Sequence, residues 1–313
     1  GPSKIAESLR EIAAHFDETI KEGAERVIAK YQPAMDAIIA KYKPRLQGKK
    51  VMLYAQGIGP IIGGLAEFAM RVIGNRVDLI TVRDKGSLAE LARLGITKPK
   101  IECTADPVLT IHPVDKAAGR AIFKRYHADG AEPVVGISVR NWQHETHFKD
   151  VMAEVSDRIV RELGARVVFL PMQFPEDVHA AESIAERTHE PCTVLKDEYT
   201  TSEFLSLVGN MDLMLAIRLH ALIFAGVMGV PMIGVSYDPK IDRFLASIGE
   251  KPVGSLDDVT ADELMAEVRR KWNDKAVFRK RNAELLAKLR DLAARNAELA
   301  LQLIGNQEKG TRR

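Results

Sequence analysis

Basic side chains stand just beyond the ends of expected strands, where open parallel sheets bind their ligands. Arg218 and His220 follow the apolar run 212–216, and Arg140 and Lys240 each come after a further apolar run. Arginine binds carboxylate and phosphate oxygens through two parallel hydrogen bonds. A helix that begins directly after Arg218 would add free N–H groups and a favourable dipole. The pattern predicts an anion site with Arg218, Arg140 and Lys240 as contacts.

Other residues near these strand ends are weaker candidates. Arg83 and Asp106 suit a ligand contact and an internal loop contact equally well. Gly57 and Gly59 would let a ligand approach closely, but a turn from strand to helix requires glycine in any case. A histidine such as His220 is more often a hydrogen-bonded structural residue, yet the arginine beside it favours a place in the site.

The remaining chemically versatile side chains indicate no metal site. His144 and His147 lie in the sequence HETH, which lacks the HExxH spacing and a third ligand, so we expect an exposed loop. Cys103 and Cys192 are far apart and have no CxxC partner, which indicates a reducing compartment and argues against disulfides or a cysteine-bound metal. Four methionines are expected in the core: Met211, Met214, Met228 and Met232.

The bulk composition is that of a soluble globular protein. The chain has 313 residues, 46% of them apolar and 28% charged, with a net charge of +2 that gives no reason to expect a nucleic-acid partner. The sequence has no apolar run long enough to span a membrane and no signal-peptide core. We therefore expect a cytoplasmic protein.

Short apolar runs alternate with amphipathic segments from residue 51 onward. The expected strands are 51–55, 78–82, 101–105, 133–139, 165–171, 192–195, 212–216 and 231–236. The expected helices lie near 61–74, 85–94, 115–127, 148–163, 175–187, 201–209, 219–229 and 240–247. Near-continuous apolar strands between helices indicate parallel sheets covered on both faces, so the predicted class is α/β.

A polar helix within 112–133 divides these strands into two groups. The later five strands suffice for a complete Rossmann-like sheet, whereas the earlier three make a truncated half with two edges to cover. The expected parts are a helical segment at 1–50, the truncated α/β half at 51–111, the Rossmann-like domain at 112–258 and C-terminal helices at 259–313.

Both ends of the chain have helical periodicity. Residues 3–42 repeat apolar positions at steps of three and four, and we expect this segment to cover the sheet edge near 51–55. The C-terminal apolar positions are Leu285, Leu289, Leu292, Leu299 and Leu303, with Asn296 among them. A homodimeric coiled coil with Asn296 setting its register is one interpretation. A long helix packed back on its own chain is favoured over it.

Six motifs occur in the order found in one enzyme family. They are YAQGIGP (54–60), LITVRD (79–84), TADP (104–107), ISVRNW (138–143), RLHALIFA (218–225) and GVSYDPK (234–240). From about residue 51 to the C-terminal end the chain resembles the polysaccharide pyruvyl transferases. These enzymes move the enolpyruvyl group of phosphoenolpyruvate onto a sugar of a bacterial cell-wall polymer or exopolysaccharide, forming a ketal. The resemblance implies a GT-B-like fold with the active site between two Rossmann-like halves.

The resemblance also implies the ligands and some roles. Phosphoenolpyruvate would be the co-substrate, with no cofactor, and an amino-sugar-containing polymer or lipid-linked precursor the acceptor. Arg218 and His220 match the RLH motif at the family's donor site, and Lys240 is a donor-phosphate contact. His220 is the candidate general acid or base. A helix N-terminus lowers a histidine pKa, whereas bound phosphate and carboxylate raise it.

The N-terminal residues resemble a different family. GPSKIAESLREIA (1–13), VIAKYQPAMDAIIAKYKPRL (27–46) and GKKVMLY (48–54) are similar to the nitrogenase molybdenum–iron protein alpha chain. Residues 1–50 contain no cysteine, so we expect no iron–sulfur ligands there. The GNxGDE-like and GGG motifs of full-length transferases are missing. The sequence therefore predicts a chimera, joined within 48–55, without the transferase's N-terminal half.

Three hypotheses about function follow. The chain is an active pyruvyl transferase, an inactive chimera that still binds anions such as phosphoenolpyruvate, or a GT-B glycosyltransferase that uses a nucleotide sugar. The motifs favour the first over the third. The physical argument favours the second, because half a cleft would not exclude water or orient an acceptor.

Overall fold

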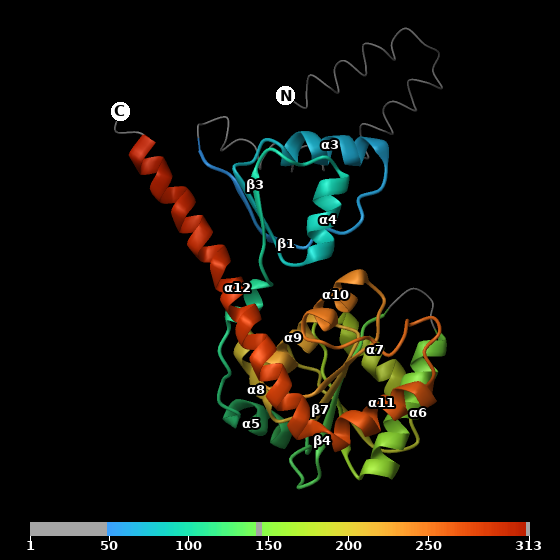
Figure 1. The fold of residues 1–313 in the computed structure, drawn as a ribbon. Coiled ribbons are helices and arrows are strands. Elements are labelled where there is room, and N and C mark those ends of the chain that lie inside the picture. Colours follow the sequence, from blue (N-terminus) through green and yellow to red (C-terminus); the bar gives the residue numbers. More distant parts are fainter. Residues whose placement is uncertain (1–48, 142–145, 311–313) are drawn as a thin grey trace, which may run out of the picture.

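The computed structural model describes residues 49–141 and 146–310 and contains two separate parallel sheets (Figure 1). The expected helical segment 1–50 falls almost entirely outside these residues, and so does its predicted cover of the first strand. His144 also lies outside them. The described residues have the predicted α/β class.

The first sheet has three parallel strands in the order β1-β2-β3. Its elements are β1 (Met52–Gln56), α3 (Gly64–Gly74), β2 (Leu79–Val82), α4 (Lys85–Arg93) and β3 (Lys100–Cys103). Asp84 caps α4 by accepting the Ser87 N–H at 2.7 Å. The core is small and centres on side chains such as Ile80, Leu91 and Ile96. Three strands bury only a small apolar core, so this first half of the chain needs contacts with other parts of the chain to be stable.

The second sheet has five parallel strands in the order β6-β5-β4-β7-β8. The strands are β4 (Val134–Ser138), β5 (Arg166–Phe169), β6 (Cys192–Val194), β7 (Leu213–Ala216) and β8 (Met232–Gly234). The chain starts in the middle at β4, moves outward to β6, and returns to the other side of β4 at β7. Strand order therefore reverses at β4, and β5 and β7 both pair with it. Ligands bind at such a switch point, outside the carboxyl ends of the strands.

Helices cover both faces of the second sheet. They are α5 (Ala117–Arg125), α6 (Thr146–Leu163), α7 (Glu176–Ala185), α8 (Thr201–Gly209), α9 (Leu219–Val227), α10 (Pro239–Ser247) and α11 (Ala261–Asn273). One face packs against α5, α8 and α9, and the other packs against α6, α7 and α11. Three of the four methionines expected in the core, Met211, Met214 and Met232, are buried, and Met228 packs against the same core partly buried.

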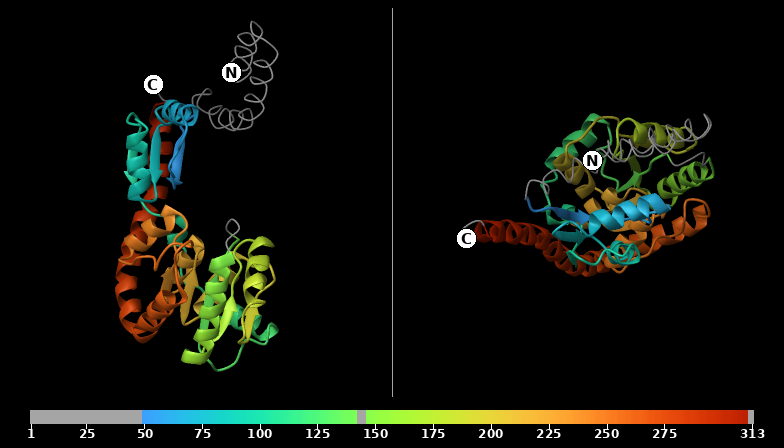
Figure 2. Two further views of the ribbon diagram at one scale, coloured as in Figure 1. Left: turned by 90° about the vertical axis from the view of Figure 1, so that its right-hand side faces the viewer. Right: turned by 90° about the horizontal axis from the view of Figure 1, so that it is seen from above.

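The last helix, α12 (Lys275–Gly310), passes both sheets. Figures 1 and 2 show it rising from the second sheet to the level of the first. Phe278 and Leu286 pack in the core of the second half. Further along, the amide of Asn296 accepts the Thr104 hydroxyl at 2.8 Å and donates to the Ala105 carbonyl at 3.1 Å. A short 3-10 helix, η1 (Pro107–Thr110), links the two halves beside α12.

All eight expected strands and the eight helices expected between residues 61 and 247 are present, with shorter limits at most ends. The favoured interpretation of the C-terminal helix is confirmed, because Asn296 is fully buried against the helix's own chain. The alternative, with Asn296 setting the register of a dimer, is wrong for this position. The limits of the four expected parts remain a prediction. None of the described helices is both long and apolar enough to cross a bilayer.

We expect Asn296→Ala to lower the free energy of unfolding by about 1–3 kcal/mol, because the buried Ala105 carbonyl loses its side-chain donor. Urea unfolding followed by circular dichroism measures the change. Asn282→Ala is the matched control: Asn282 lies on the same helix, is equally buried, and its amide has no partner among the described residues. Equal losses in both variants would contradict the proposed role of the Asn296 contact.

Candidate functional site

A cavity of about 420 Å³ lies at the carboxyl ends of the strands, with walls from both halves of the chain. Its lining residues are Arg83, Arg140, Met172, Gln173, Tyr199, Thr201, Phe204, Arg218, Leu219, His220, Phe224, Tyr237 and Lys240. Four of these are permanent cations and none is a carboxylate. The three predicted anion contacts, the candidate catalytic histidine and Arg83 thus share one cavity. This space, called the basic cavity below, attracts anions.

Arg218 is held from behind by a buried carboxylate. It occupies the N-cap position of α9, where the chain turns from β7 into the helix, without capping the helix itself. Its Nε donates to Asp177 Oδ2 at 2.9 Å and its Nη2 donates to Asp177 Oδ1. Nη2 also donates to the Gln173 side chain at 3.2 Å. The guanidinium is therefore fixed in orientation before any ligand arrives.

Arg140 and Lys240 both lie close to the ring of Tyr237. Arg140 Nη1 donates to the Tyr237 hydroxyl at 3.0 Å, and the guanidinium carbon lies 5.3 Å from the centre of the ring. Lys240 Nζ lies 5.5 Å from the same ring and 3.1 Å from Asp238 Oδ2. Asp238 also caps α10 by accepting the Lys240 N–H. One aromatic ring thus offers a favourable contact to both cations.

Arg83 comes from the first half and is tied to that half by an ion pair. Its Nη1 donates to Asp106 Oδ2 at 2.7 Å, while Asp106 Oδ1 accepts the Val108 N–H at the start of η1. A Cβ on Gly57 would lie 2.5 Å from the Arg83 guanidinium, so a larger residue there would displace that guanidinium. Gly59 has open space around its Cα and no such conflict.

Arg83 and Lys240 also line an adjoining cavity of about 490 Å³ between the halves. Asp106 lies in its wall, as do Cys103 and apolar side chains from α9, α10 and α12. Asp106 therefore stands behind Arg83 rather than in the basic cavity, and Gly57 and Gly59 line neither space.

His220 opens onto the basic cavity, so its surface is solvent-accessible although protein surrounds it. Its pKa lies below the usual value of 6.5, chiefly because those walls desolvate the charged ring. Asp106 opposes this shift, whereas Arg83, Lys240 and Arg218 reinforce it. The direction agrees with the lowered pKa expected for a histidine at a helix N-terminus, and burial is the largest of the causes. The imidazole is therefore mainly neutral near pH 7 in the empty cavity.

Sequence reasoning missed the residues that orient these cations. Asp177 and Gln173 hold Arg218, and Tyr237 contacts both Arg140 and Lys240. Tyr237 stands inside the motif GVSYDPK and could have been noticed there. Asp177 offered one weak signal, a carboxylate in the first turn of a helix that follows a strand.

The described residues contain no cluster of three His, Cys, Asp or Glu side chains that could hold a metal ion. His147 is exposed as expected, but it lies in the first turn of α6 and not in a loop. Cys103 and Cys192 are both free, as expected, and burial raises the pKa of each thiol. A raised pKa keeps a thiol protonated and unreactive near neutral pH.

The fold is that of GT-B glycosyltransferases and sugar epimerases. HepE from Anabaena, solved with UDP, superposes with a TM-score of 0.62 over 86% of this chain and 76% of its own, at 11% identity. The UDP-GlcNAc 2-epimerase of Neisseria meningitidis gives 0.60 over 96% and 81%, at 13% identity. A glycosyltransferase from Rickettsia africae gives 0.60 over 98% and 83%, at 12% identity. Identities this low show the fold alone.

The family is shown by a sequence model. The model of the polysaccharide pyruvyl transferases matches residues 23–239, more than two thirds of the chain. The chain belongs to this family. The match begins earlier than the expected start near residue 51 and ends before the C-terminal helices.

The second resemblance is also confirmed. A stretch of 76 residues is 64% identical to the nitrogenase molybdenum–iron protein alpha chain of Bradyrhizobium sp. (strain ANU 289) and 57% identical to that of Azotobacter vinelandii. It makes up 24% of this chain but only 15% of the length of either nitrogenase chain. The stretch is longer than the 54 residues expected from the motifs.

We expect anion binding to raise the pKa of His220, because the ligand's negative charge offsets the surrounding cations. Binding at a pH between the two pKa values then takes up as much as about one proton per ligand, and affinity falls as the pH rises through the higher value. Calorimetric titration of phosphoenolpyruvate in buffers of different ionisation enthalpy measures this uptake.

The ligand's own phosphate also exchanges protons near neutral pH, so a His220→Gln variant serves as the reference. The wild type should take up more protons than the variant at the same pH. Equal uptake by both proteins would show that His220 does not respond to the bound anion.

Proposed function

We propose that the basic cavity binds phosphoenolpyruvate and supports transfer of its enolpyruvyl group to a sugar. The observation that carries this proposal is the convergence of Arg83, Arg140, Arg218, Lys240 and His220 on one cavity of about 420 Å³. Phosphoenolpyruvate carries a phosphate and a carboxylate within one small molecule. Four cationic side chains suit a ligand with two anionic groups better than a ligand with a single phosphate.

Enolpyruvyl transfer requires a proton at the methylene carbon of phosphoenolpyruvate. A proton from His220, charged once the anion is bound, converts the CH2 to CH3 and leaves a cationic centre at the adjacent carbon. One sugar hydroxyl attacks that centre and releases its proton to a base. The bond to phosphate then breaks, a second hydroxyl attacks the same carbon, and the proton of that hydroxyl goes to the departing phosphate. The products are the ketal and inorganic phosphate, so atoms and charge balance.

The surrounding cations would favour departure of phosphate. Lys240 and the two arginines from the second half bring positive charge to the oxygens that gain negative charge as the bond breaks. Their orientation is set in advance by Asp177, Asp238 and Tyr237, so little reorganisation is needed. The acceptor, in this proposal, is an amino-sugar-containing polymer or lipid-linked precursor.

A nucleotide sugar is the second candidate ligand. Structures with the same fold were solved with UDP or UDP-GlcNAc, and the cavity has four aromatic rings, Tyr199, Phe204, Phe224 and Tyr237, that could pack against a base. The four cations carry more positive charge than one diphosphate would neutralise. The cavity therefore favours phosphoenolpyruvate, which is smaller and more densely charged than a nucleotide sugar.

We further propose that two parent sequences meet in this chain near β1. The nitrogenase match and the pyruvyl transferase match support this, as does the motif VMLY, which fits both. A chain of this kind can retain donor binding while transfer to an acceptor is lost, so binding and transfer must be measured separately.

We expect phosphoenolpyruvate to bind the wild type and to bind Lys240→Ala about tenfold more weakly, because the variant loses one charge-assisted contact. Lys240 is the better probe than Arg218: its pair with Asp238 is partly solvent-exposed and adds little stability. Removing Arg218 would instead leave Asp177 buried and unpaired. Isothermal calorimetry measures both affinities, and Lys251→Ala, an exposed lysine outside the cavity, is the control.

Mass spectrometry of an amino-sugar-containing acceptor incubated with the donor then tests transfer. A gain of one pyruvate less one water establishes a pyruvyl transferase, and donor binding without that gain establishes anion binding alone. Tight binding of UDP-GlcNAc with none of phosphoenolpyruvate would overturn the proposal in favour of the nucleotide sugar.

A further inference from the structure

Asp177 is completely buried although it carries an ionisable carboxylate, and its partners come from two elements far apart in the sequence. Oδ2 accepts the backbone N–H groups of Met172 and Gln173, at 3.0 and 2.9 Å, in the loop between β5 and α7. The same carboxylate takes both Nε and Nη2 of Arg218, which begins α9. One side chain thus joins two walls of the basic cavity.

This arrangement leaves one nitrogen of Arg218 for a ligand. Nε and Nη2 are engaged by Asp177 and Gln173, while Nη1 has no partner among the described residues. A guanidinium is rigid and planar, so fixing two of its nitrogens also fixes the direction of the third. The Arg218 side chain therefore loses its conformational entropy during folding, and ligand binding does not carry that cost again.

We infer that Asp177 is a positioning residue for anion binding, acting through Arg218. The inference rests on the proposed function of the cavity. Asp177 does not line the cavity itself. It sets the direction of the Arg218 guanidinium and holds Gln173, whose side chain accepts a hydrogen bond from the same guanidinium.

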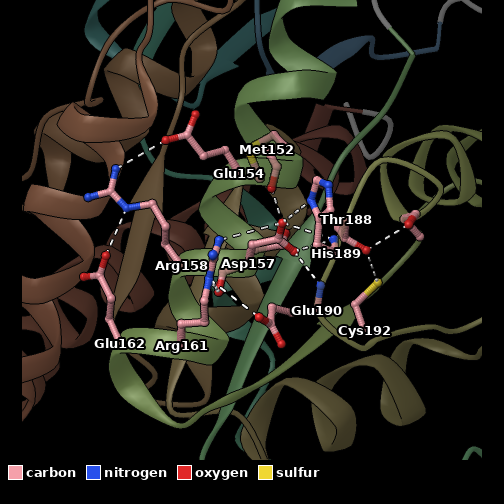
Figure 3. A network of polar contacts seen from close by, with 12 residues as sticks. Met152, Glu154, Asp157, Arg158, Arg161, Glu162, Thr188, His189, Glu190 and Cys192 are labelled. Atoms are coloured by element: carbon pink, nitrogen blue, oxygen red, sulfur yellow. Dashed lines mark hydrogen bonds and ion pairs between the residues drawn. The ribbon is translucent and has the colours of Figure 1, made fainter.

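A purely structural role is the alternative, and the chain contains a close parallel to it. Asp157 on α6 is also buried and accepts backbone N–H groups, from His189 and Glu190 at 2.9 Å each, together with the His189 ring at 3.0 Å. Figure 3 shows Asp157 at the centre of this network, with Arg161 beside it. Asp157 and its partners line no part of the basic cavity. It therefore has Asp177's structural features without the link to Arg218.

The test compares Asp177→Asn, Asp157→Asn, Arg218→Gln and the double variant Asp177→Asn with Arg218→Gln, all in the full chain. Calorimetry gives the affinities for phosphoenolpyruvate and inorganic phosphate, and thermal unfolding gives stability. We expect Asp177→Asn to bind both ligands at least tenfold more weakly and Asp157→Asn to bind like the wild type. The double variant should bind no more weakly than Arg218→Gln, because Asp177 acts only through that arginine.

Nitrogen-15 NMR of arginine side chains supplies a readout independent of ligand. The Arg218 Nε–H signal, assigned by its loss in Arg218→Gln, should exchange slowly with water in the wild type and in Asp157→Asn, and fast in Asp177→Asn. The double variant replaces the buried pair by two neutral amides, so it keeps the comparison possible if Asp177→Asn alone is too unstable to study.

Unchanged affinity and an unchanged Arg218 signal in Asp177→Asn would overturn the inference. So would an equal loss of affinity in Asp157→Asn, or additive losses in the double variant. If the wild type binds neither phosphoenolpyruvate nor phosphate, the proposed function fails. The Arg218 signal then still decides whether Asp177 positions the arginine.

Discussion

The small first sheet depends on α12, because three parallel strands cannot bury enough apolar surface to stand alone. The helix begins in the core of the second half and reaches Thr104 and Ala105, directly after β3, through Asn296. These are the residues that lead into Asp106 and its partner Arg83. The position of the one cation that the first half contributes to the cavity therefore follows from a buried amide near the far end of the chain.

A second constraint shapes the cavity itself, since several cations in one space repel one another. Arg83 pairs with Asp106, Arg218 with Asp177 and Lys240 with Asp238, and each carboxylate stands behind its cation rather than in the cavity. Arg140 packs on Tyr237 instead. The pairs reduce the repulsion while the open side stays positive. Burial is the main cause of the low pKa of His220, and the nearby cations lower it further.

Sequence predicted the strands, the helices and the basic side chains because each depends on local patterns: apolar runs, turn residues and motifs of a few residues. The pairs behind the cations depend on strand order instead. Asp177 meets Arg218 because β5 and β7 both lie beside β4, although 41 residues separate the two in the chain. Asn296 was correctly recognised as a polar residue in an apolar stripe. Periodicity alone cannot say whether such a stripe packs on a second copy or on its own chain.

The two family matches become compatible once β1 is seen as an edge strand. It pairs in parallel with β2 alone, with Met52 opposite Leu79. An edge strand is specified by apolar character and length more than by particular side chains, so strands from unrelated parents can occupy the position. The side chains that make the basic cavity all come from later in the chain, from Arg83 to Lys240. A junction near β1 would therefore change the chain that precedes the first sheet. It would leave the residues of the basic cavity unchanged.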